Sequence, residues 1–153
     1  MTSQTTLREG APAPDFTLLT NTNETVTLSE QRGSPVVLTT FVLAFQDEDR
    51  EQLRGFEAQR EAFEAAGAKV YGLSADPGAT HRAWVERGQI TLPLLSDFRE
   101  RTMMAAYGLT DPETGTMVRR TFVLDQDGIV RKVIVSDQVA DHAAQALEAV
   151  RAL

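Results

Sequence analysis

The chain has 153 residues, of which 42% are hydrophobic and 24% charged, values typical of one globular domain that spans residues 1–153. Its formal net charge of −7 argues against nucleic acid or an anionic membrane as a partner. No apolar run is long enough to cross a membrane and the first eight residues lack a secretory-signal pattern, so we expect a cytoplasmic protein.

Cysteine is absent from the chain. The protein therefore has no disulfide, no thiolate metal ligand and no thiol nucleophile. His81 and His142 are far apart in the sequence, and neither has a second ligand at the usual metal-binding spacing. We expect neither a metal site nor a cofactor.

The first half of the chain predicts a hairpin followed by strand, helix and strand. Two β-prone runs flank the turn residues Asn21 and Asn23. A long apolar face then indicates a helix that ends at Gly67. The predicted elements are strands at 16–19 and 24–27, a helical turn at 28–33, a buried strand at 36–41, a helix at 47–66 and a strand at 70–74.

The second half continues the alternation and closes with another hairpin and a helix. Gly88 and Gly108 are placed to end two helices, and Asp97 to cap the start of the second. Asp127-Gly128 indicates a tight hairpin turn. The predicted elements are helices at 79–87, 97–107 and 140–153, and strands at 92–95, 121–124 and 129–135; the last helix presents Ala144, Leu147 and Val150 at spacings of three.

This order predicts an α/β protein with a mixed central sheet flanked by helices and an N-terminal β-hairpin extension, which is a thioredoxin-like arrangement. Several short motifs add a family resemblance. They are Ala13-Pro-Asp-Phe-Thr-Leu18, Val36-Val-Leu38 with Phe41 and Leu43-Ala-Phe45, Gly72-Leu-Ser74 with Asp76, Leu94-Leu-Ser-Asp97, Tyr107-Gly108, and Thr121-Phe-Val-Leu-Asp125 with Gly128. Together they resemble the peroxiredoxin (AhpC/TSA) family, in particular its bacterioferritin-comigratory and AhpE-like members, and imply the peroxiredoxin type of thioredoxin fold.

The resemblance fails at the residues that carry the family's chemistry. The family loop has the form Pro-x-x-x-Thr-x-x-Cys, and the matching positions here hold Val42, Gln46 and Asp49. The position of the family's active-site arginine holds Arg119. Only the arginine is retained, so the resemblance implies a degenerate site with Asp49 at the peroxidatic position and no catalytic residue.

A carboxylate cannot replace the lost thiolate, because it is a poor nucleophile toward peroxide and forms no sulfenic acid. Thiol peroxidase activity is therefore not expected. Asp49 lies four residues before Leu53, on the apolar face of its helix. Burial of a lone carboxylate would cost several kcal/mol, and the helix dipole returns only roughly 0.3–1 kcal/mol. We therefore predict an ion pair between Asp49 and Arg119, in the pocket that Gln46 also flanks.

Several simpler readings remain open. The carboxylates at 47–49 could cap the helix alone, hold an anion or cation through a remodelled pocket, or take part in new acid–base or metal chemistry. We expect His81 and Trp84 to form a surface or half-buried pair. We expect Met103 and Met104 to be core residues. Arg131 with Lys132 fits strand-edge charge, and Arg119-Arg120 is too small a basic group for nucleic acid.

Two functions are compatible with these residues. The first is a non-catalytic relative that acts as a binding module, as a sensor of an unidentified small molecule, or as a homodimer. The dimer would form through loops that flank the site, which carry Val42, Leu43 and Phe45. The second is an enzyme that reuses the carboxylates with the arginine. The resemblance also implies the antioxidant and oxidoreductase label of the family, and the sequence supports that label but not the activity.

Overall fold

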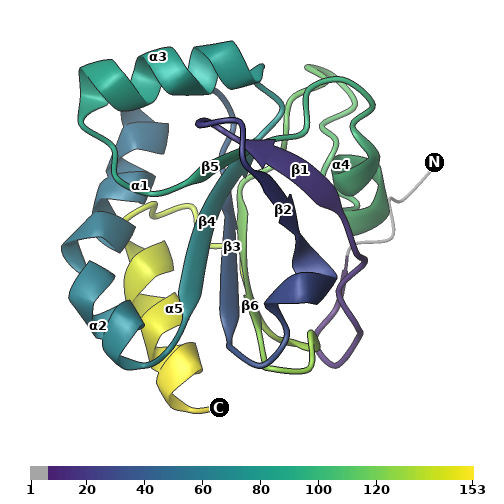
Figure 1. The fold of residues 1–153 in the computed structure, drawn as a ribbon, viewed down its shortest axis with the longest axis vertical. Helices are drawn as coiled ribbons and strands as arrows, with labels where there is room; N and C mark the ends of the chain where they lie inside the picture. Colours follow the sequence, from purple (N-terminus) through teal and green to yellow (C-terminus); the bar gives the residue numbers. More distant parts are fainter. Residues whose placement is uncertain (1–6) are drawn as a thin grey trace.

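A seven-stranded mixed sheet forms the centre of the computed structural model, which describes residues 7–153 (Figure 1). The strands are β1 (Thr17–Thr20), β2 (Thr25–Thr27), β3 (Val36–Thr40), β4 (Lys69–Ser74), β5 (Leu94–Ser96), β6 (Arg120–Leu124) and β7 (Val130–Ile134). The helices are the 3-10 turn η1 (Leu28–Gln31), α1 (Asp47–Ala58), α2 (Arg60–Ala65), α3 (Gly78–Gly88), α4 (Thr102–Tyr107) and α5 (Asp141–Arg151).

The strand order in the sheet is β2-β1-β5-β4-β3-β6-β7. The strands β3, β4 and β5 run parallel, while β1 and β6 pair antiparallel to their neighbours. Thr40, the last residue of β3, pairs with Arg120, the first residue of β6. This register brings the chain before β6 to the same edge of the sheet as the loops that follow β3 and β4.

Two apolar layers cover the two faces of the sheet. On one face α1, α2, α3 and α5 contribute to a core that includes Phe41, Phe56, Phe63 and Trp84, and Figure 1 shows α1, α2 and α5 gathered on that side. On the other face α4 and η1 cover a core built around Tyr107, Phe122 and the adjacent methionines. Met103 and Met104 are buried as predicted.

The thioredoxin-like α/β arrangement with its N-terminal hairpin is confirmed, and β7 with exposed Arg131 and Lys132 is indeed an edge strand. The single helix predicted at 47–66 is wrong. Gln59 interrupts it with φ −103° and ψ 12°, and its N–H bonds the carbonyl of Phe56 three residues back. No proline or glycine marks this tight turn, so the pattern of apolar residues could not reveal it.

Three other helix predictions need correction. Gly88 is still helical, and Gln89 adopts the left-handed conformation that ends α3. Asp97 lies five residues before α4, although its carboxylate accepts the backbone N–H of Met104 at 2.8 Å and so still satisfies the helix start. Ala144 is exposed, because α5 buries Ala143, Ala146, Leu147 and Val150.

Over residues 7–153, none of these helices combines the length and the apolar character that a membrane crossing requires.

Candidate functional site

Three segments meet at one edge of the sheet. They are the loop 41–46 that follows β3, the first turn of α1, and the residues just before β6. Loops after parallel strands gather at the same edge, which is the usual place for a site in an α/β protein. This geometry brings Asp49 and Arg119 together, although 70 residues separate them in the chain.

Asp49 is fully buried in the first turn of α1. Its Oδ1 accepts the backbone N–H of Val42 at 3.0 Å, and its Oδ2 accepts that of Leu43 at 3.3 Å. Arg119 Nη2 donates to Oδ1 at 2.7 Å. The carboxylate thus binds two loop amides and one guanidinium, which compensates for its removal from water.

The predicted Asp49–Arg119 ion pair is present. Asp49 does not act as a simple helix cap, since both oxygens bind the preceding loop rather than the free N–H groups of α1. Its neighbours Asp47 and Glu48 are exposed, and Glu48 Oε2 lies 3.7 Å from Arg119 Nη1. Of the three carboxylates, Asp49 alone faces the interior.

A second side of Arg119 is held by Gln52, which lies one turn beyond Asp49 on the same face of α1. Arg119 Nε donates to Gln52 Oε1 at 2.7 Å. Gln52 Nε2 in turn donates to Thr39 Oγ1 at 2.7 Å and to the carbonyl of Thr40 at 2.9 Å. The guanidinium is therefore fixed in two directions, and 17% of its side chain remains exposed.

Another carboxylate holds the same loop from the side of β4. Asp76 Oδ2 accepts the N–H of Ala44 at 2.9 Å and the hydroxyl of Ser74 at 2.7 Å. Because Asp76 only accepts, the Ser74 hydroxyl donates to it and accepts from Nε2 of His81, 2.7 Å away. Burial lowers the pKa of His81 to about 4, although nearby Asp76 opposes this effect. The three consecutive backbone amides of residues 42–44 thus donate hydrogen bonds to two carboxylates, Asp49 and Asp76.

The loop is completed by Phe45, which adopts φ 68° and is 49% exposed. This left-handed conformation, unusual for a bulky residue, turns the chain into α1. The Phe45 ring lies 6.3 Å from that of Trp84, whose ring is 5.3 Å from that of Phe41. The prediction that His81 and Trp84 form a surface or half-buried pair is wrong, because both side chains are buried beneath this loop.

A cavity of about 240 Å³ opens beside the ion pair. Its walls include Val42, Arg119 and Arg120, and the segment just before β6 contributes Asp111, Thr116 and Met117. Arg119 therefore belongs both to the ion pair and to the wall of this cavity. Within residues 7–153 no group of three or more histidine, aspartate or glutamate side chains gathers as a metal site would require.

The sequence-derived residues occupy different places in this arrangement. Asp49 is buried, Arg119 is partly buried and pairs with it, and Val42 supplies a backbone donor, whereas Gln46 is the exposed residue that precedes α1. Its role in binding stays a prediction. Gln52, Asp76 and His81 were not expected. The three-residue spacing between Asp49 and Gln52 was a signal for Gln52, since it puts both on one helix face, whereas Asp76 appeared only as a position of a family motif.

Comparison with known proteins decides the family. A model of the AhpC/TSA family matches residues 10–133. The chain belongs to the AhpC/TSA family. Alkyl hydroperoxide reductase E of Mycobacterium tuberculosis is 37% identical over 127 residues, which cover 82% of this chain and 83% of the relative. A putative peroxiredoxin of Synechocystis is 31% identical over 159 residues, covering 95% and 79%.

Solved structures agree with this AhpC/TSA assignment. The crystal structure of peroxidoxin BcpB from Mycobacterium tuberculosis is similar with a TM-score of 0.88 and 30% identity, covering 96% of this chain and 98% of the other. The bacterioferritin comigratory protein of Xanthomonas campestris has a TM-score of 0.82 at 24% identity, covering 90% of each chain, and supports the fold alone. This AhpC/TSA protein nevertheless has no cysteine.

Proposed function

We propose that this chain is an AhpC/TSA family protein without thiol peroxidase activity, and that it works as a binding module through the surface around its substituted site. One observation carries the proposal: Asp49, which the family resemblance assigns to the cysteine position, uses both carboxylate oxygens for bonds within the protein.

The chemical argument begins with the missing thiol. Reduction of a peroxide by a thiolate joins sulfur to one peroxide oxygen and expels the other as hydroxide or alkoxide, leaving a sulfenic acid. No residue of this chain can form that intermediate, because cysteine is absent throughout. The retained Arg119 can orient an anion but supplies no electrons.

The environment of Asp49 also argues against its use in new acid–base chemistry. A general base must reach the proton that it removes. Asp49 is fully buried and already accepts hydrogen bonds from Val42, Leu43 and Arg119. Its carboxylate is better placed to hold the loop and the guanidinium than to receive a substrate.

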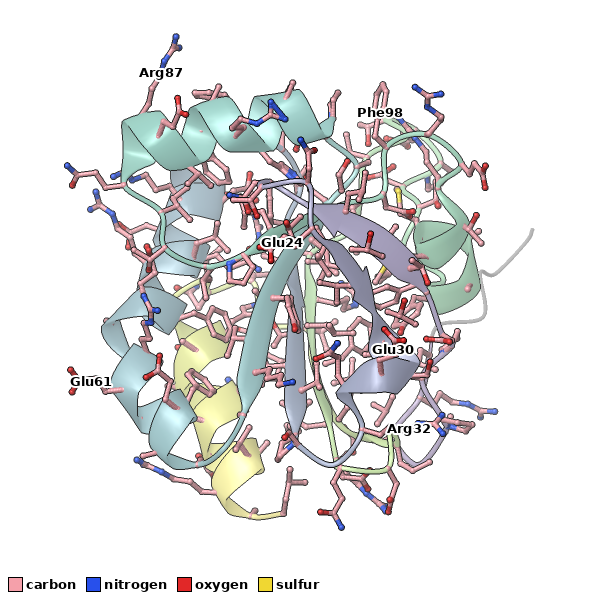
Figure 2. All side chains as sticks on the ribbon, in the orientation of Figure 1. Glu24, Glu30, Arg32, Glu61, Arg87 and Phe98 are labelled. Atoms are coloured by element: carbon pink, nitrogen blue, oxygen red, sulfur yellow. The ribbon has the colours of Figure 1, made fainter. Side chains whose placement is uncertain are left out.

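The loop fixed in this way presents apolar side chains to solvent. Leu43 and Phe45 are exposed on it, and the loop after β5 exposes Phe98, which Figure 2 shows at the same end of the molecule as α3. Exposed apolar groups on loops at one end of a molecule favour a protein contact. A second copy of the chain is the partner that we propose for this surface.

A peroxide assay tests the loss of chemistry. With hydrogen peroxide or an organic hydroperoxide, and with a dithiol as reductant, the native chain is expected to consume peroxide at the protein-free rate. The matched variant combines Val42→Pro, Gln46→Thr and Asp49→Cys. It is expected to gain a thiol that one equivalent of peroxide oxidises, because Arg119 and the scaffold are retained.

Turnover by the native chain above the protein-free control would contradict the proposal. The variant serves as the positive control, since its oxidation shows that the assay detects a peroxide-reactive thiol at residue 49.

A further inference from the structure

A continuous row of buried hydrogen bonds leads away from the ion pair, past the neighbouring strands β3 and β6, to His142 on α5. Arg119 Nε bonds Gln52, and Gln52 Nε2 bonds Thr39 Oγ1, at 2.7 Å each. Thr39 Oγ1 is 2.8 Å from Thr121 Oγ1, which is 2.7 Å from His142 Nδ1. The row ends at the carbonyl of Ser136, 2.9 Å from His142 Nε2.

The direction of every bond in this row follows from its two ends. A guanidinium only donates and a carbonyl only accepts. Gln52 must therefore present its oxygen to Arg119, and His142 must carry a proton on Nε2. The neutral ring then accepts at Nδ1 from Thr121. Thr121 accepts from Thr39, and Thr39 accepts from Gln52, so all donors point from Arg119 toward Ser136 and strengthen one another.

A second proton on His142 is incompatible with this order. It would sit on Nδ1, where the Thr121 hydroxyl now donates. Thr121 would then have to turn its own proton toward Thr39, which already donates toward Thr121. The side chains of Gln52, Thr39, Thr121 and His142 are all fully buried. No water is therefore within reach to accept the Thr121 hydroxyl proton, and the row must break at one of its bonds.

The charges around His142 oppose its protonation on balance. From the β6 side Arg119 and Arg120 face it, and Asp141 lies beside it on α5. Burial is the largest cause that lowers the pKa of His142, and the two arginines lower it further, while the bond to Ser136 and the charge of Asp141 raise it. Two residues of α1 are connected to His142 by the row. They are Gln52 and, through Arg119, the carboxylate Asp49.

We propose that His142 is a proton-sensitive positioning residue: the neutral ring holds Arg119 on Asp49 through Gln52, Thr39 and Thr121, and protonation loosens the ion pair and the loop at 42–45. This regulation concerns the same edge of the sheet as the proposed function, but it follows from the hydrogen bonds alone. It would stand even if the native chain reduced peroxide.

Nuclear magnetic resonance of the full, isotope-labelled chain tests the proposal during a pH titration. The His142 ring is expected to titrate below the ordinary pKa of histidine. The Arg119 Nε–H and Gln52 side-chain amide signals should move with the same midpoint. Backbone amide exchange at Val42 and Leu43, corrected for its intrinsic pH dependence, should accelerate on the order of tenfold as the ring protonates, because both amides bind Asp49.

Two variants separate this row from other sources of pH dependence. In His142→Asn the side-chain oxygen can still accept from Thr121 but cannot be protonated over this range, so the coupled shifts of Arg119 and Gln52 should vanish. His81 is the matched control, because it also reaches the loop, through Ser74 and Asp76, and its pKa is about 4. His81→Asn should leave the coupled shifts in place.

The proposal is overturned if His142 titrates while the Arg119 and Gln52 signals stay fixed, or if those signals still titrate together in a folded His142→Asn variant. The first measurement needs only the native chain, so it decides the matter even where the variant fails to fold.

Discussion

At the scale of single residues, the site depends on one carboxylate with several bonds. Asp49 is fully buried, yet it binds Arg119 at 2.7 Å and the amides of Val42 and Leu43. An isolated buried charge would be strongly destabilising, whereas this one has a cation and two donors around it. The carboxylate therefore joins α1, the preceding loop and the start of β6 at one point.

Asp49→Asn tests this role. The amide has one oxygen and two N–H groups, so its nitrogen would face either the N–H of Leu43 or both the N–H of Val42 and the guanidinium of Arg119. We expect a loss of about 3 kcal/mol in the free energy of unfolding, because Arg119 loses its buried counter-charge. Urea unfolding followed by circular dichroism measures the change.

The matched control is Asp47→Asn in the same helical turn. Asp47 is exposed, and its replacement should change stability by less than about 0.5 kcal/mol. If Asp49→Asn changed the free energy of unfolding as little as Asp47→Asn, the buried carboxylate would contribute nothing to stability.

At the scale of secondary structure elements, close approach between neighbouring strands matters at Gly72 on β4. A Cβ there would lie 2.7 Å from Leu94 Cδ2 on β5 and 3.4 Å from Leu53 Cδ2 on α1. Both leucines are fully buried, and densely packed interiors leave little room for them to move. The strand therefore needs glycine for space rather than for an unusual backbone conformation.

Gly72→Ala should lower the free energy of unfolding by about 1–3 kcal/mol, which is typical of an overpacked core. Gly78→Ala is the control, because a Cβ at this first residue of α3 meets nothing within 4 Å. Alanine favours a helix by up to about 1 kcal/mol over glycine, so this variant should be unchanged or slightly more stable. Thermal unfolding of both proteins gives the comparison, and a Gly72→Ala protein as stable as Gly78→Ala would refute the packing argument.

At the scale of the whole molecule, exposed apolar side chains are unevenly placed. Leu43, Phe45 and Phe98 lie on loops that follow parallel strands, near the edge of the sheet that carries the site. The chain end, with Leu153, lies at the opposite end of the molecule (Figure 1). This distribution is the basis for the proposed homodimer.

Sedimentation velocity over a range of protein concentrations is expected to show a dimer for the native chain and a monomer for Phe45→Glu, because a charge in the contact would remain desolvated. Leu153→Glu is the matched control, since Leu153 is also 50% exposed but distant from the site, and it should sediment like the native chain. A native chain that stays monomeric at the highest concentration would rule out this partner.

The sequence by itself determined the order of the elements, the mixed sheet and the pairing of Asp49 with Arg119. Alternating strands and helices allow few topologies, and a carboxylate on the apolar face of a helix needs a nearby cation. The family motifs supplied the position of that cation.

Only the tertiary structure decided the break at Gln59, the burial of His81 and Trp84, and the hydrogen bonds of Gln52. The burial of His81 and Trp84 and the bonds of Gln52 depend on residues far apart in the chain. Gln52 meets Thr39 and Arg119 through the packing of α1 on β3 and β6, while His81 reaches the loop through Ser74. The local sequence pattern indicates which face of a helix is apolar. It does not indicate which polar residue of another element will form a hydrogen bond with that face.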